Sequence, residues 1–384
     1  MMSRPPIRCV FILHDLSGGG AERVTLNLIR NLNRKLFVPT LFLFERVGEL
    51  ICDIPEDLPV IVGREPGEGF IAGGIRTVRA LIALARTSEV IIGALEHRAI
   101  FVAALMSAWS GKPALGWVHK DLVYYASHLP PINRLIYRML IRLSFRRLSK
   151  IIAVSHGVAS ALAKLLPRLR ERVQVIYNPI DEGRILERSK EAVPDWAAGV
   201  LAKPVIMAVG RLEDQKGFDL LIEAHARIRE CGCDHNLLII GEGQRRAFLT
   251  EVARERGVAQ SVFMPGFCNP FPLMIRSRML ALSSRFEGLP SVLIEAMMLG
   301  VPVVAARCPS GPAELLDDGR CGTLVRTEDV GELKAQLEKV LKEPESVIPL
   351  LETARKMTGR FDRATIMAQW ESAIEANVSR EESG

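Results

Sequence analysis

The sequence lacks the features that would place it in several large protein classes. Its seven cysteines are odd in number and show no repeated metal-ligand spacing, because Cys231 and Cys233 stand too close for a zinc knuckle and have no second pair nearby. The best candidate for a membrane span, residues 100–110, is too short to cross a bilayer. The apolar run at residues 7–13 has no small-residue cleavage site and reads as a buried strand. We therefore expect a cytoplasmic protein with reduced thiols.

Motifs that define several enzyme classes are also missing. The scattered His, Cys, Asp and Glu residues form no metal-binding pattern, so we expect no metal ion and no cofactor. No Ser or Thr follows Lys216, which excludes a P-loop. The run Gly18, Gly19 and Gly20 does not have the spacing of a dinucleotide fingerprint, because the last glycine of that pattern is missing. Ser155 lacks the surroundings of a nucleophile elbow and is better explained as a helix cap.

The composition is that of a globular protein with an uneven charge. The 384 residues suffice for two domains of ordinary size, and 48% of them are hydrophobic. Residues 1–190 carry 27 Lys and Arg against 16 Asp and Glu, whereas residues 191–384 carry 23 against 28. The basic first half predicts an anionic partner. No aromatic residues are interleaved with the basic ones, so we do not expect nucleic acid to be that partner.

Short apolar runs alternate with helical patterns in both halves of the chain. Continuous apolar runs are typical of parallel strands that are covered on both faces. They are residues 9–13, 38–44, 90–94, 114–119 and 151–154 in the first half, and 205–209, 236–240, 262–265, 279–283 and 302–305 in the second. Two such series predict an α/β protein with two doubly wound, Rossmann-like domains. Such sheets bind ligands at the carboxyl ends of their strands, so we expect the domains to face each other across a cleft.

The domain boundary is expected near residues 178–181. We assign residues 1–185 to an N-terminal domain and residues 196–362 to a C-terminal domain, with the polar residues 182–195 as a linker. The last segment, 363–384, contains a helical pattern and is predicted to form a C-terminal helix that can cross back to the first domain.

Two acids, Glu287 and Glu295, are the most informative residues of the chain. They are separated by the turn-forming residues Gly288, Leu289, Pro290 and Ser291. Pro suits the first helical position and Ser suits a cap, so a helix is expected to start at one of the last two. Glu287 then lies on a loop and Glu295 about one turn inside the helix. Two carboxylates beside free backbone N–H groups can bind hydroxyls and an anion, which is the chemistry of a sugar nucleotide.

Three glycine-containing turns follow predicted strands. Residues 210–217 carry Arg211 and Lys216, which could converge on a diphosphate, although an isolated match of this kind could be a solvated loop. Gly241 and Gly243 form a second turn, which alone is weak. Gly18, Gly19 and Gly20 precede Glu22 and Arg23 at a predicted helix start, where the backbone could approach an anion, or simply turn.

Histidines end two of the predicted strands. His119 is placed at the end of the strand 114–119 and would face the cleft, although a buried structural role is equally open. Asp121 could orient its imidazole ring or lie in solvent. His14 is a weaker candidate in the same kind of position.

A helix in the first half carries a periodic basic stripe. Arg134, Arg138, Arg142 and Arg146 recur every four residues, and Arg147 and Lys150 add charge. Apolar residues complete the amphipathic pattern, which favours an anionic membrane surface. An ordinary amphipathic surface helix remains an equal alternative.

Together these residues resemble the retaining glycosyltransferases of the GT-B fold, in the large group 1 family of bacterial cell-envelope enzymes. The resemblance covers nearly the whole chain and is strongest over residues 204–325, where the acid pair, the 210–217 loop, the 241–243 turn and the run 301–305 occur in the family's order. Residues 18–24 are similar to the subgroup that builds lipid-linked oligosaccharides and surface polysaccharides. One departure is that Lys120 separates His119 from Asp121, where family members often have His followed directly by Asp.

The resemblance implies a role for each candidate residue. Glu295 would bind the donor ribose, and Glu287 and His119 would contact the donor sugar, while Arg211 and Lys216 would hold the diphosphate and stabilise the leaving group. The donor-binding residues would also include Gly241, Gly243, Gly288, Leu289, Pro290 and Ser291. Gly18, Gly19, Gly20, Glu22 and Arg23 would lie near the phosphates or the acceptor.

These roles predict a metal-independent enzyme on the inner face of the cytoplasmic membrane. It would move a hexose or N-acetylhexosamine from a nucleotide sugar, with a UDP-sugar favoured, to a lipid-linked or polysaccharide acceptor with retention of configuration. The alternatives are a GDP-mannose-dependent mannosyltransferase, a sugar-nucleotide epimerase and a non-catalytic sugar-nucleotide-binding protein on the same fold.

Overall fold

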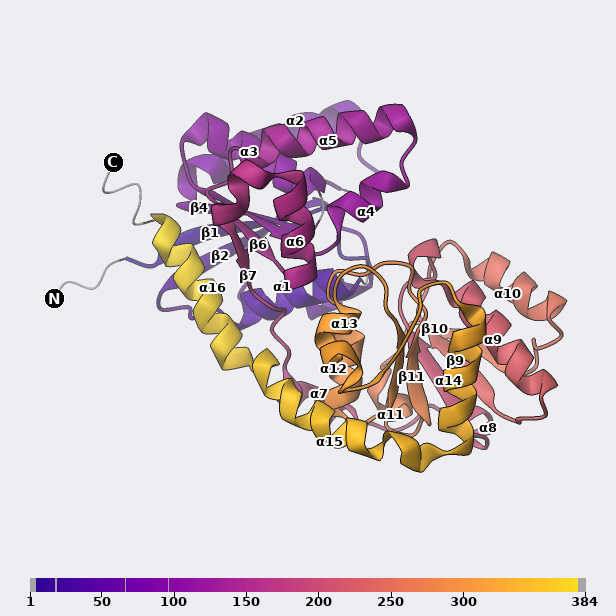
Figure 1. Ribbon diagram of the computed structural model, residues 1–384. Helices are drawn as coiled ribbons and strands as arrows, with labels where there is room; N and C mark the ends of the chain where they lie inside the picture. The colour runs from indigo at the N-terminus through magenta and orange to yellow at the C-terminus, as the bar shows by residue number, and fades with distance from the viewer. Residues whose placement is uncertain (1–4, 18, 66, 96, 379–384) are drawn as a thin grey trace. The chain divides into compact units, whose positions relative to one another are not determined.

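The chain folds into two compact units. The computed structural model describes residues 5–17, 19–65, 67–95 and 97–378, so Gly18 lies outside the described residues. The first unit contains the chain up to Pro179 together with the segment that begins at Arg363, and the second unit is Ile180–Asp362 (Figure 1). The chain therefore leaves the first unit once and returns to it through its last helix.

The first unit is built on a seven-stranded parallel sheet with the strand order β3-β2-β1-β4-β5-β6-β7. Its strands are β1 (Ile7–Leu13), β2 (Phe37–Glu45), β3 (Val60–Arg64), β4 (Val90–Leu95), β5 (Ala114–Val118), β6 (Lys150–Ala153) and β7 (Val173–Val175). Residues 9–13 of β1 are all buried, because helices cover both faces of a parallel sheet. The strand order reverses between β1 and β4, which makes the carboxyl ends of these two strands the switch point of the sheet.

Helices connect these strands by crossovers. They are α1 (Gly20–Asn31), α2 (Phe70–Thr87), α3 (His97–Ser110), α4 (Leu122–Ser127), α5 (Pro131–Phe145), α6 (His156–Leu165) and α16 (Arg363–Val378), with short 3-10 segments at Glu49–Asp53 and Pro167–Arg172. The predicted cap of α6 is confirmed, since Ser155 Oγ accepts a 3.2 Å hydrogen bond from the Val158 backbone N–H. Helices α2, α3 and α5 gather on one side of the sheet (Figure 1).

The second unit has a six-stranded parallel sheet with the order β10-β9-β8-β11-β12-β13. Its strands are β8 (Val205–Val209), β9 (Asn236–Ile240), β10 (Val262–Gly266), β11 (Met279–Leu282), β12 (Val303–Ala306) and β13 (Thr323–Val325). Its helices are α7 (Glu182–Arg188), α8 (Ala197–Leu201), α9 (Phe218–Glu230), α10 (Arg246–Glu255), α11 (Phe271–Met274), α12 (Ser291–Met298), α13 (Pro312–Leu315), α14 (Val330–Lys342) and α15 (Ile348–Met357), and four 3-10 segments join them. This sheet reverses between β8 and β11.

The predicted class of fold is confirmed, and several local expectations are wrong. The edge strands β3, β7 and β13 were not predicted, and their short, only partly buried sequences explain why. Residues 182–188 form helix α7 rather than a linker, because Asp181 caps that helix by accepting from the Arg184 backbone N–H at 3.1 Å. The start of α12 lies at the expected turn, but Pro290 takes the cap and Ser291 the first helical position.

Helix α16 belongs to the first unit although it ends the chain. Its Trp370 is fully buried and packs edge-on against Trp117 of β5, with ring centroids 4.5 Å apart. Its Glu371 carboxylate accepts a 3.0 Å hydrogen bond from the backbone N–H of Asn33. Over the described residues, no helix combines the length and the apolar character that crossing a bilayer requires.

Candidate functional site

Three loops of the second unit converge at the carboxyl edge of its sheet. The loop after β8 carries Arg211 and Lys216, the turn after β9 carries Gly241 and Gly243, and the loop after β11 carries Glu287. These strands are neighbours in the order β9-β8-β11. The loops after β8 and β11 therefore flank the point at which the strand order reverses, where open α/β sheets bind their ligands.

Lys216 and Glu287 form a largely buried ion pair across this switch point. The Lys216 Nζ atom lies 2.6 Å from Glu287 Oε1, and only 18% and 6% of the two side chains are exposed. The Ser284 hydroxyl donates a second hydrogen bond of 2.6 Å to the same oxygen. Two donors thus fix the orientation of the Glu287 carboxylate, while the Lys216 ammonium keeps further N–H donors that this pair does not use.

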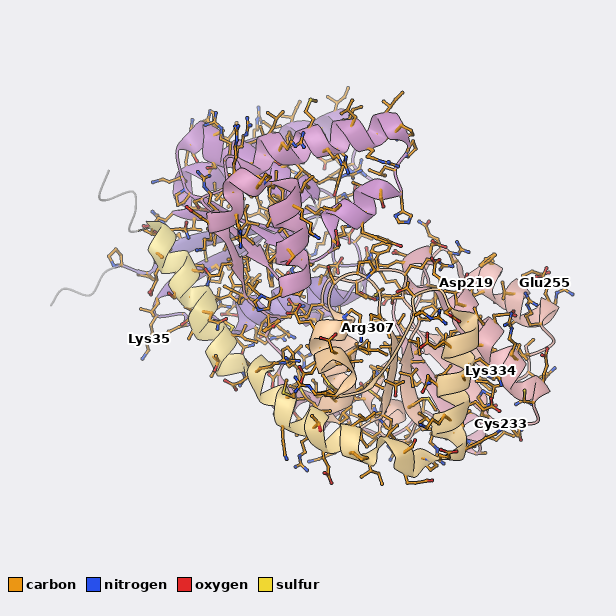
Figure 2. All side chains as sticks on the ribbon, viewed as in Figure 1. Lys35, Asp219, Cys233, Glu255, Arg307 and Lys334 are labelled. Carbon is orange, nitrogen blue, oxygen red and sulfur yellow. The ribbon has the colours of Figure 1, made fainter. Side chains whose placement is uncertain are left out.

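A second ion pair anchors the loop that carries Glu287. The Arg285 guanidinium binds both carboxylate oxygens of Asp219, at 3.0 and 2.7 Å, and also contacts Glu328 at 3.0 Å. Asp219 stands in the first turn of α9, where Figure 2 labels it. The hydrogen bonds that Arg285 donates to Asp219 raise the pKa of Arg285, and although burial alone would raise the pKa of Asp219, these bonds lower it. The chain just before Glu287 is therefore held by charge-assisted bonds.

The 210–217 loop is tied to Glu287's loop by its own polar contacts. The Gln215 side-chain amide donates to the Phe286 carbonyl at 3.0 Å, and the Ser283 hydroxyl donates to the Lys216 carbonyl at 2.9 Å. Gly217 has a φ of 59°, and a Cβ atom there would stand 2.3 Å from the Ser283 carbonyl oxygen. Only glycine allows the two loops to approach this closely.

Gly241 likewise allows the loops after β8 and β9 to approach each other closely. Its φ is 142°, and a Cβ atom would stand 2.0 Å from the Gly210 carbonyl oxygen. The Leu212 backbone N–H donates to the Glu242 carbonyl at 2.8 Å, which continues the pairing of the two strands into their loops. A Cβ atom on Gly243 would meet the Leu212 carbonyl oxygen at 2.6 Å. The structure thus gives both glycines a packing reason beside their predicted donor contact.

Glu295 projects from an otherwise buried stretch of α12. Among residues 292–297, it is the only one that is not buried. Gly311 packs against the turn before α12. Its φ is 89°, and a Cβ atom on it would stand 2.8 Å from the Gly288 carbonyl oxygen. Leu289 within that turn is buried. The turn and the helix therefore place Glu295 at a defined, half-buried position on the same unit as Glu287.

Arg211 is held more loosely than Lys216. Its guanidinium lies 3.6 Å from Glu213, and 44% of its side chain is exposed. A weak, exposed ion pair contributes little stability, so this guanidinium can reorient toward an anion at small cost.

In the first unit, the described part of the predicted glycine loop caps helix α1. Gly19 is the N-cap and Gly20 the first helical residue. Glu22 is the third helical residue, and its Oε2 atom would lie 2.1 Å from a Cβ atom on Gly19, so the carboxylate lies over the helix start. Arg23 follows on the same helix. An anion that binds here must displace this carboxylate, whereas a hydroxyl could donate to it.

His119 lies immediately after β5, not within it as predicted, since the strand ends at Val118. Its Nε2 atom is buried and has no hydrogen-bond partner within the described residues. Burial, and then the charge of Lys120, lowers the pKa of His119 to about 3. The ring is therefore neutral near pH 7 and can exchange one hydrogen bond with a ligand without adding charge.

The other predicted polar residues near His119 have structural roles. Asp121 caps α4 by accepting hydrogen bonds of 2.9 Å from the backbone N–H groups of Val123 and Tyr124, so it neither orients the imidazole nor lies free in solvent. His14 Nδ1 lies 3.0 Å from Asp15 Oδ2 at the end of β1.

The predicted basic stripe is divided in the structure. The Arg134 guanidinium donates to the carbonyls of Ser127 and Leu129, at 2.6 and 3.1 Å, and so holds the turn between α4 and α5. Arg138 is half-buried. Lys150 is not on the helix but opens β6. Arg142, Arg146 and Arg147 are exposed near the carboxyl end of the helix.

Sequence reasoning missed the residues that hold the acids in place. Ser284, Gln215, Arg285 and Asp219 had no motif that would identify them, because their partners are 3 to 71 residues away and meet only through the fold. Across the residues that the structure describes, no three His, Cys, Asp or Glu side chains gather in a way that could hold a metal ion.

The two units match two family models. Residues 198–357 match the model for glycosyl transferases group 1, and residues 18–184 match the model for glycosyltransferase family 4. The two matches cover both units and include the loops described above.

Characterised relatives and solved structures agree with these matches. The chain is 25% identical over 92% of its length, and 95% of the other protein, to an N-acetylgalactosaminyltransferase of Campylobacter jejuni that is named for a diphospho-undecaprenol-linked substrate. It is 30% identical to the lipopolysaccharide core biosynthesis glycosyltransferase LpsE of Rhizobium meliloti, over 58% of this chain and 63% of that protein. The crystal structure of Anabaena HepE with UDP and glucose superimposes with a TM-score of 0.81, covering 96% of this chain and 100% of HepE at 22% identity.

Proposed function

The chain belongs to the glycosyltransferases of the GT-B fold, and we propose that it moves a hexose or N-acetylhexosamine from a UDP-sugar to a lipid-linked glycan during cell-envelope biosynthesis. Retention of configuration and independence from metal ions are parts of the same proposal. The enzyme would act in the cytoplasm on the inner face of the membrane, where nucleotide sugars and lipid-linked acceptors meet.

One observation carries this proposal. At the switch point of the second sheet, the buried Lys216–Glu287 pair joins a cation that can face a diphosphate to a carboxylate that can face sugar hydroxyls. Ser284 and the Arg285–Asp219 pair hold the geometry before any ligand arrives. Fixed charges of this kind stabilise charge that develops in a transition state without reorganisation.

The mechanism follows from the charges of the reaction. The bond between the anomeric carbon of the donor sugar and the diphosphate oxygen breaks, and an acceptor hydroxyl oxygen bonds to that carbon. The diphosphate takes the bonding electrons, so negative charge grows on it, and the hydroxyl proton is released. Lys216 and the mobile Arg211 guanidinium would stabilise the departing diphosphate. Glu287 would hold hydroxyls of the sugar, Glu295 would bind the ribose, and neutral His119 would position the sugar by one hydrogen bond.

The relatives support the proposed donor and acceptor. HepE has been crystallised with UDP and with UDP-glucose, and the Campylobacter jejuni enzyme is named for an undecaprenyl diphosphate-linked substrate. A GDP-mannose-dependent mannosyltransferase of Mycolicibacterium smegmatis is also similar, at 34% identity over 38% of this chain, so GDP-mannose is the second candidate donor.

The test is donor binding followed by turnover. We would titrate the protein calorimetrically with UDP-glucose, UDP-N-acetylglucosamine, UDP-N-acetylgalactosamine and GDP-mannose, each with and without a chelator. We expect one UDP-sugar to bind equally well in both conditions. NMR of the product made from an undecaprenyl diphosphate-linked acceptor should show the anomeric configuration of the donor.

Matched variants separate the site from the fold. Glu295→Ala should weaken donor binding by about tenfold or more, because the ribose hydroxyls lose a charged acceptor. Arg254→Gln removes an exposed arginine of α10 that pairs with its helix neighbour Glu251, and this variant should bind donor normally. Binding of GDP-mannose alone would replace the donor assignment. Nucleotide release without any acceptor, with a sugar that is altered rather than transferred, would favour an epimerase.

A further inference from the structure

Helix α5 exposes its apolar side rather than burying it. The side chains of Ile132, Leu135, Ile136, Met139, Leu140 and Leu143 are all exposed, and Ile132 is 75% accessible. Their spacing of three and four residues places them on one stripe. Tyr137, Ile141 and Phe145 supply the buried side, roughly opposite at 100° per residue. A helix that needed only a soluble surface would carry polar residues on this stripe.

Helix α2 also exposes a row of apolar side chains. Phe70, Ile71, Ile75, Val78 and Ile82 are exposed, and Phe70 is 84% accessible. The last four again follow a spacing of three and four residues. By contrast, α2 buries three residues, Gly73, Leu84 and Ala85, and of these only Leu84 has a large side chain.

Helix α3 joins the two stripes into one surface. It packs against α2 and against α5 on the same side of the first sheet (Figure 1). It exposes Leu105 and Trp109, and the Arg86 guanidinium of α2 lies 5.5 Å from the centre of the Trp109 ring. We call the exposed apolar residues of α2, α3 and α5 the three-helix face. So many exposed apolar residues on three helices that pack together exceed the scattered exposure that is normal on soluble proteins.

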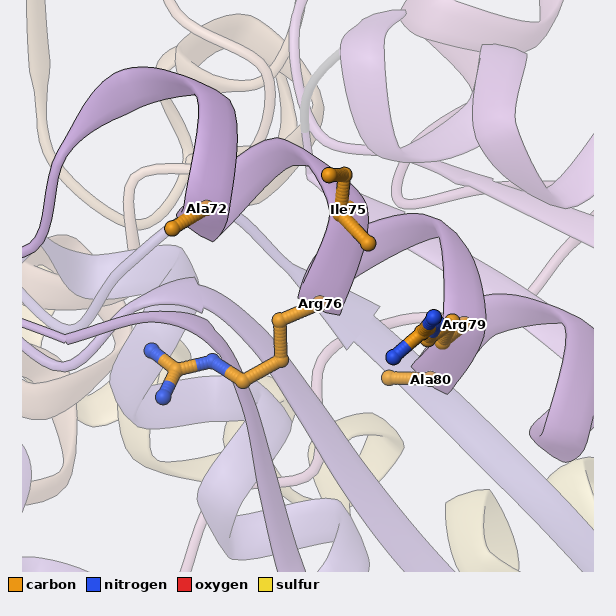
Figure 3. Close-up of a pocket in the computed structure, with 5 residues that line it drawn as sticks. All are labelled: Ala72, Ile75, Arg76, Arg79 and Ala80. Carbon is orange, nitrogen blue, oxygen red and sulfur yellow. The ribbon is translucent and has the colours of Figure 1, made fainter.

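The three helices themselves carry charge of one sign, although Arg76 of α2 pairs with Glu68 just before that helix. The sequences of α2, α3 and α5 contain seven arginines and no Asp or Glu. An open pocket on α2, lined by Ala72, Ile75, Arg76, Arg79 and Ala80, places two arginines beside apolar side chains (Figure 3). An anionic headgroup and the start of its acyl chain present the complementary chemistry.

We propose that the three-helix face inserts its apolar side chains into an anionic lipid bilayer, with its arginines at the headgroups. The proposal deepens the proposed function by naming the membrane partner and the surface that meets it. A second copy of the chain fits less well, because two such faces would bring arginines against arginines, and α2, α3 and α5 carry no acid of their own to pair them. The expected attachment is thus by insertion as well as by charge, unlike that of a basic stripe alone.

The test measures vesicle binding without donor or acceptor, so its result does not depend on catalysis. Vesicles of phosphatidylglycerol and phosphatidylcholine are compared with vesicles of phosphatidylcholine alone, by sedimentation and by fluorescence of Trp109 in a Trp196→Phe background. We expect Trp109 emission to shift to the blue on binding and to be quenched by brominated lipid. Trp117 and Trp370 are fully buried and should not respond.

Paired substitutions locate the contact. Ile71→Ser with Ile75→Ser, and Leu135→Ser with Met139→Ser, should each weaken vesicle binding by about tenfold or more. Arg142→Gln with Arg146→Gln should weaken it and reduce its dependence on salt. Phe248→Ser and Ile348→Ser, which alter exposed apolar residues of α10 and α15, serve as controls that should bind normally. All variants should keep the calorimetric unfolding transition of the unit that carries the substitution, which shows that they fold.

Three results would overturn the inference. They are vesicle binding that the serine pairs leave unchanged, Trp109 emission that does not respond to bound vesicles, and a wild-type dimer that Leu135→Ser with Met139→Ser converts to a monomer in sedimentation velocity. Turnover of a detergent-solubilised acceptor by a protein that fails to bind vesicles would leave the proposed function standing. Vesicle binding by a protein without turnover would leave the three-helix face standing.

Discussion

At the scale of single residues, the site depends on one buried carboxylate with two donors. One oxygen of the Glu287 carboxylate accepts hydrogen bonds from both Lys216 and Ser284, so the orientation of the carboxylate is set in the absence of substrate. Removing either charge leaves the other partly buried without its partner, which is the more costly state of a buried pair.

We predict strong coupling between Lys216 and Glu287. Glu287→Ala alone should lower the free energy of unfolding of the second unit by roughly 3–5 kcal/mol, because Lys216 keeps its charge in a site that is only slightly exposed. The double variant with Lys216→Ala should lose much less than the sum of the two single variants. Urea unfolding of the four proteins, without ligand, measures this difference.

The same variants also report on catalysis. Lys216→Ala should reduce kcat by ~100-fold or more if its ammonium stabilises the leaving diphosphate. Glu345→Ala, at an exposed glutamate of the 3-10 segment before α15, provides a variant that should change neither quantity. Additive unfolding energies in the double variant would contradict the coupling, and unchanged kcat in Lys216→Ala would remove that residue from the proposed mechanism.

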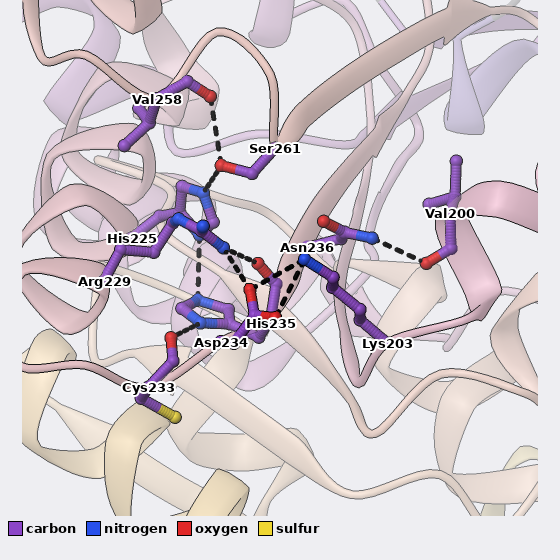
Figure 4. A network of polar contacts seen from close by, with 10 residues as sticks. All are labelled: Val200, Lys203, His225, Arg229, Cys233, Asp234, His235, Asn236, Val258 and Ser261. Atoms are coloured by element: carbon purple, nitrogen blue, oxygen red, sulfur yellow. Dashed lines mark hydrogen bonds and ion pairs between the residues drawn. The ribbon is translucent and has the colours of Figure 1, made fainter.

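At the scale of secondary-structure elements, a chain of uncharged hydrogen bonds joins α9 to the sheet of the second unit. His225 of α9 lies 2.8 Å from His235 through Nδ1 and 2.8 Å from the Ser261 hydroxyl through Nε2 (Figure 4). His235 Nδ1 lies 2.9 Å from the Cys233 carbonyl. One set of neutral tautomers satisfies these three bonds: His235 donates to the carbonyl, His225 donates to His235, and Ser261 donates to His225. The single hydroxyl proton of Ser261 then cannot also serve the Val258 carbonyl, which lies 3.1 Å away.

This chain predicts a loss of stability in acid. Burial, and then the charge of His235, lowers the pKa of His225 to about 3, and the pKa of His235 is lowered as well. In the unfolded chain a histidine gains its proton near pH 6.5. Between these values the unfolded state binds the extra proton, so stability is fully present above about pH 6.5 and falls by ~1.4 kcal/mol per pH unit below it for each such histidine.

Hydrogen exchange can measure this loss of stability in the elements next to the two histidines. After correction for intrinsic rates, protection of the α9 and β9 amides should fall from pH 7 to pH 5 in the wild type. His225→Asn should flatten that dependence, whereas His156→Asn, at an exposed histidine of the first unit, should leave it unchanged. Equal slopes in wild type and His225→Asn would show that His225 does not titrate differently on unfolding.

At the scale of the whole molecule, the chain closes the first unit with residues from its far end. Trp370 and Trp117 fill one core from positions 253 residues apart, and both are fully buried. The last helix is therefore part of the first unit's core and not an appendage.

Removal of residues 363–384 should destabilise the first unit selectively. The deletion exposes the Trp117 ring and removes the buried Trp370, a loss comparable to the ~3–5 kcal/mol of a large aromatic truncation. Calorimetry should show a lowered transition for the first unit, with donor binding by the second unit retained. Trp370→Ala should reproduce most of the effect, and Lys356→Ala, at an exposed position of α15, should have none. A lowered transition for the second unit would contradict the assignment of α16.

The class of fold could be predicted because the pattern of each strand is local. Continuous apolar runs mark β1, β8 and β9 whatever their neighbours, and Gly217 and Pro290 mark turns through their own backbone limits. The short edge strand β7 has no such signal, because its residues are only partly buried and its pairing depends on β6.

The sequence by itself determined two parallel α/β units, the loops that carry Arg211, Lys216 and Glu287, and the helix that carries Glu295. Backbone preferences and apolar periodicity act over a few residues, so one chain reveals them. Tertiary structure alone decided that Lys216 pairs with Glu287 and that Arg285 binds Asp219. It also decided that α5 exposes Ile132, Leu135 and Met139 while it buries Ile141. An amphipathic pattern fixes that a helix has two faces, but only packing against the sheet and α3 decides which face is buried.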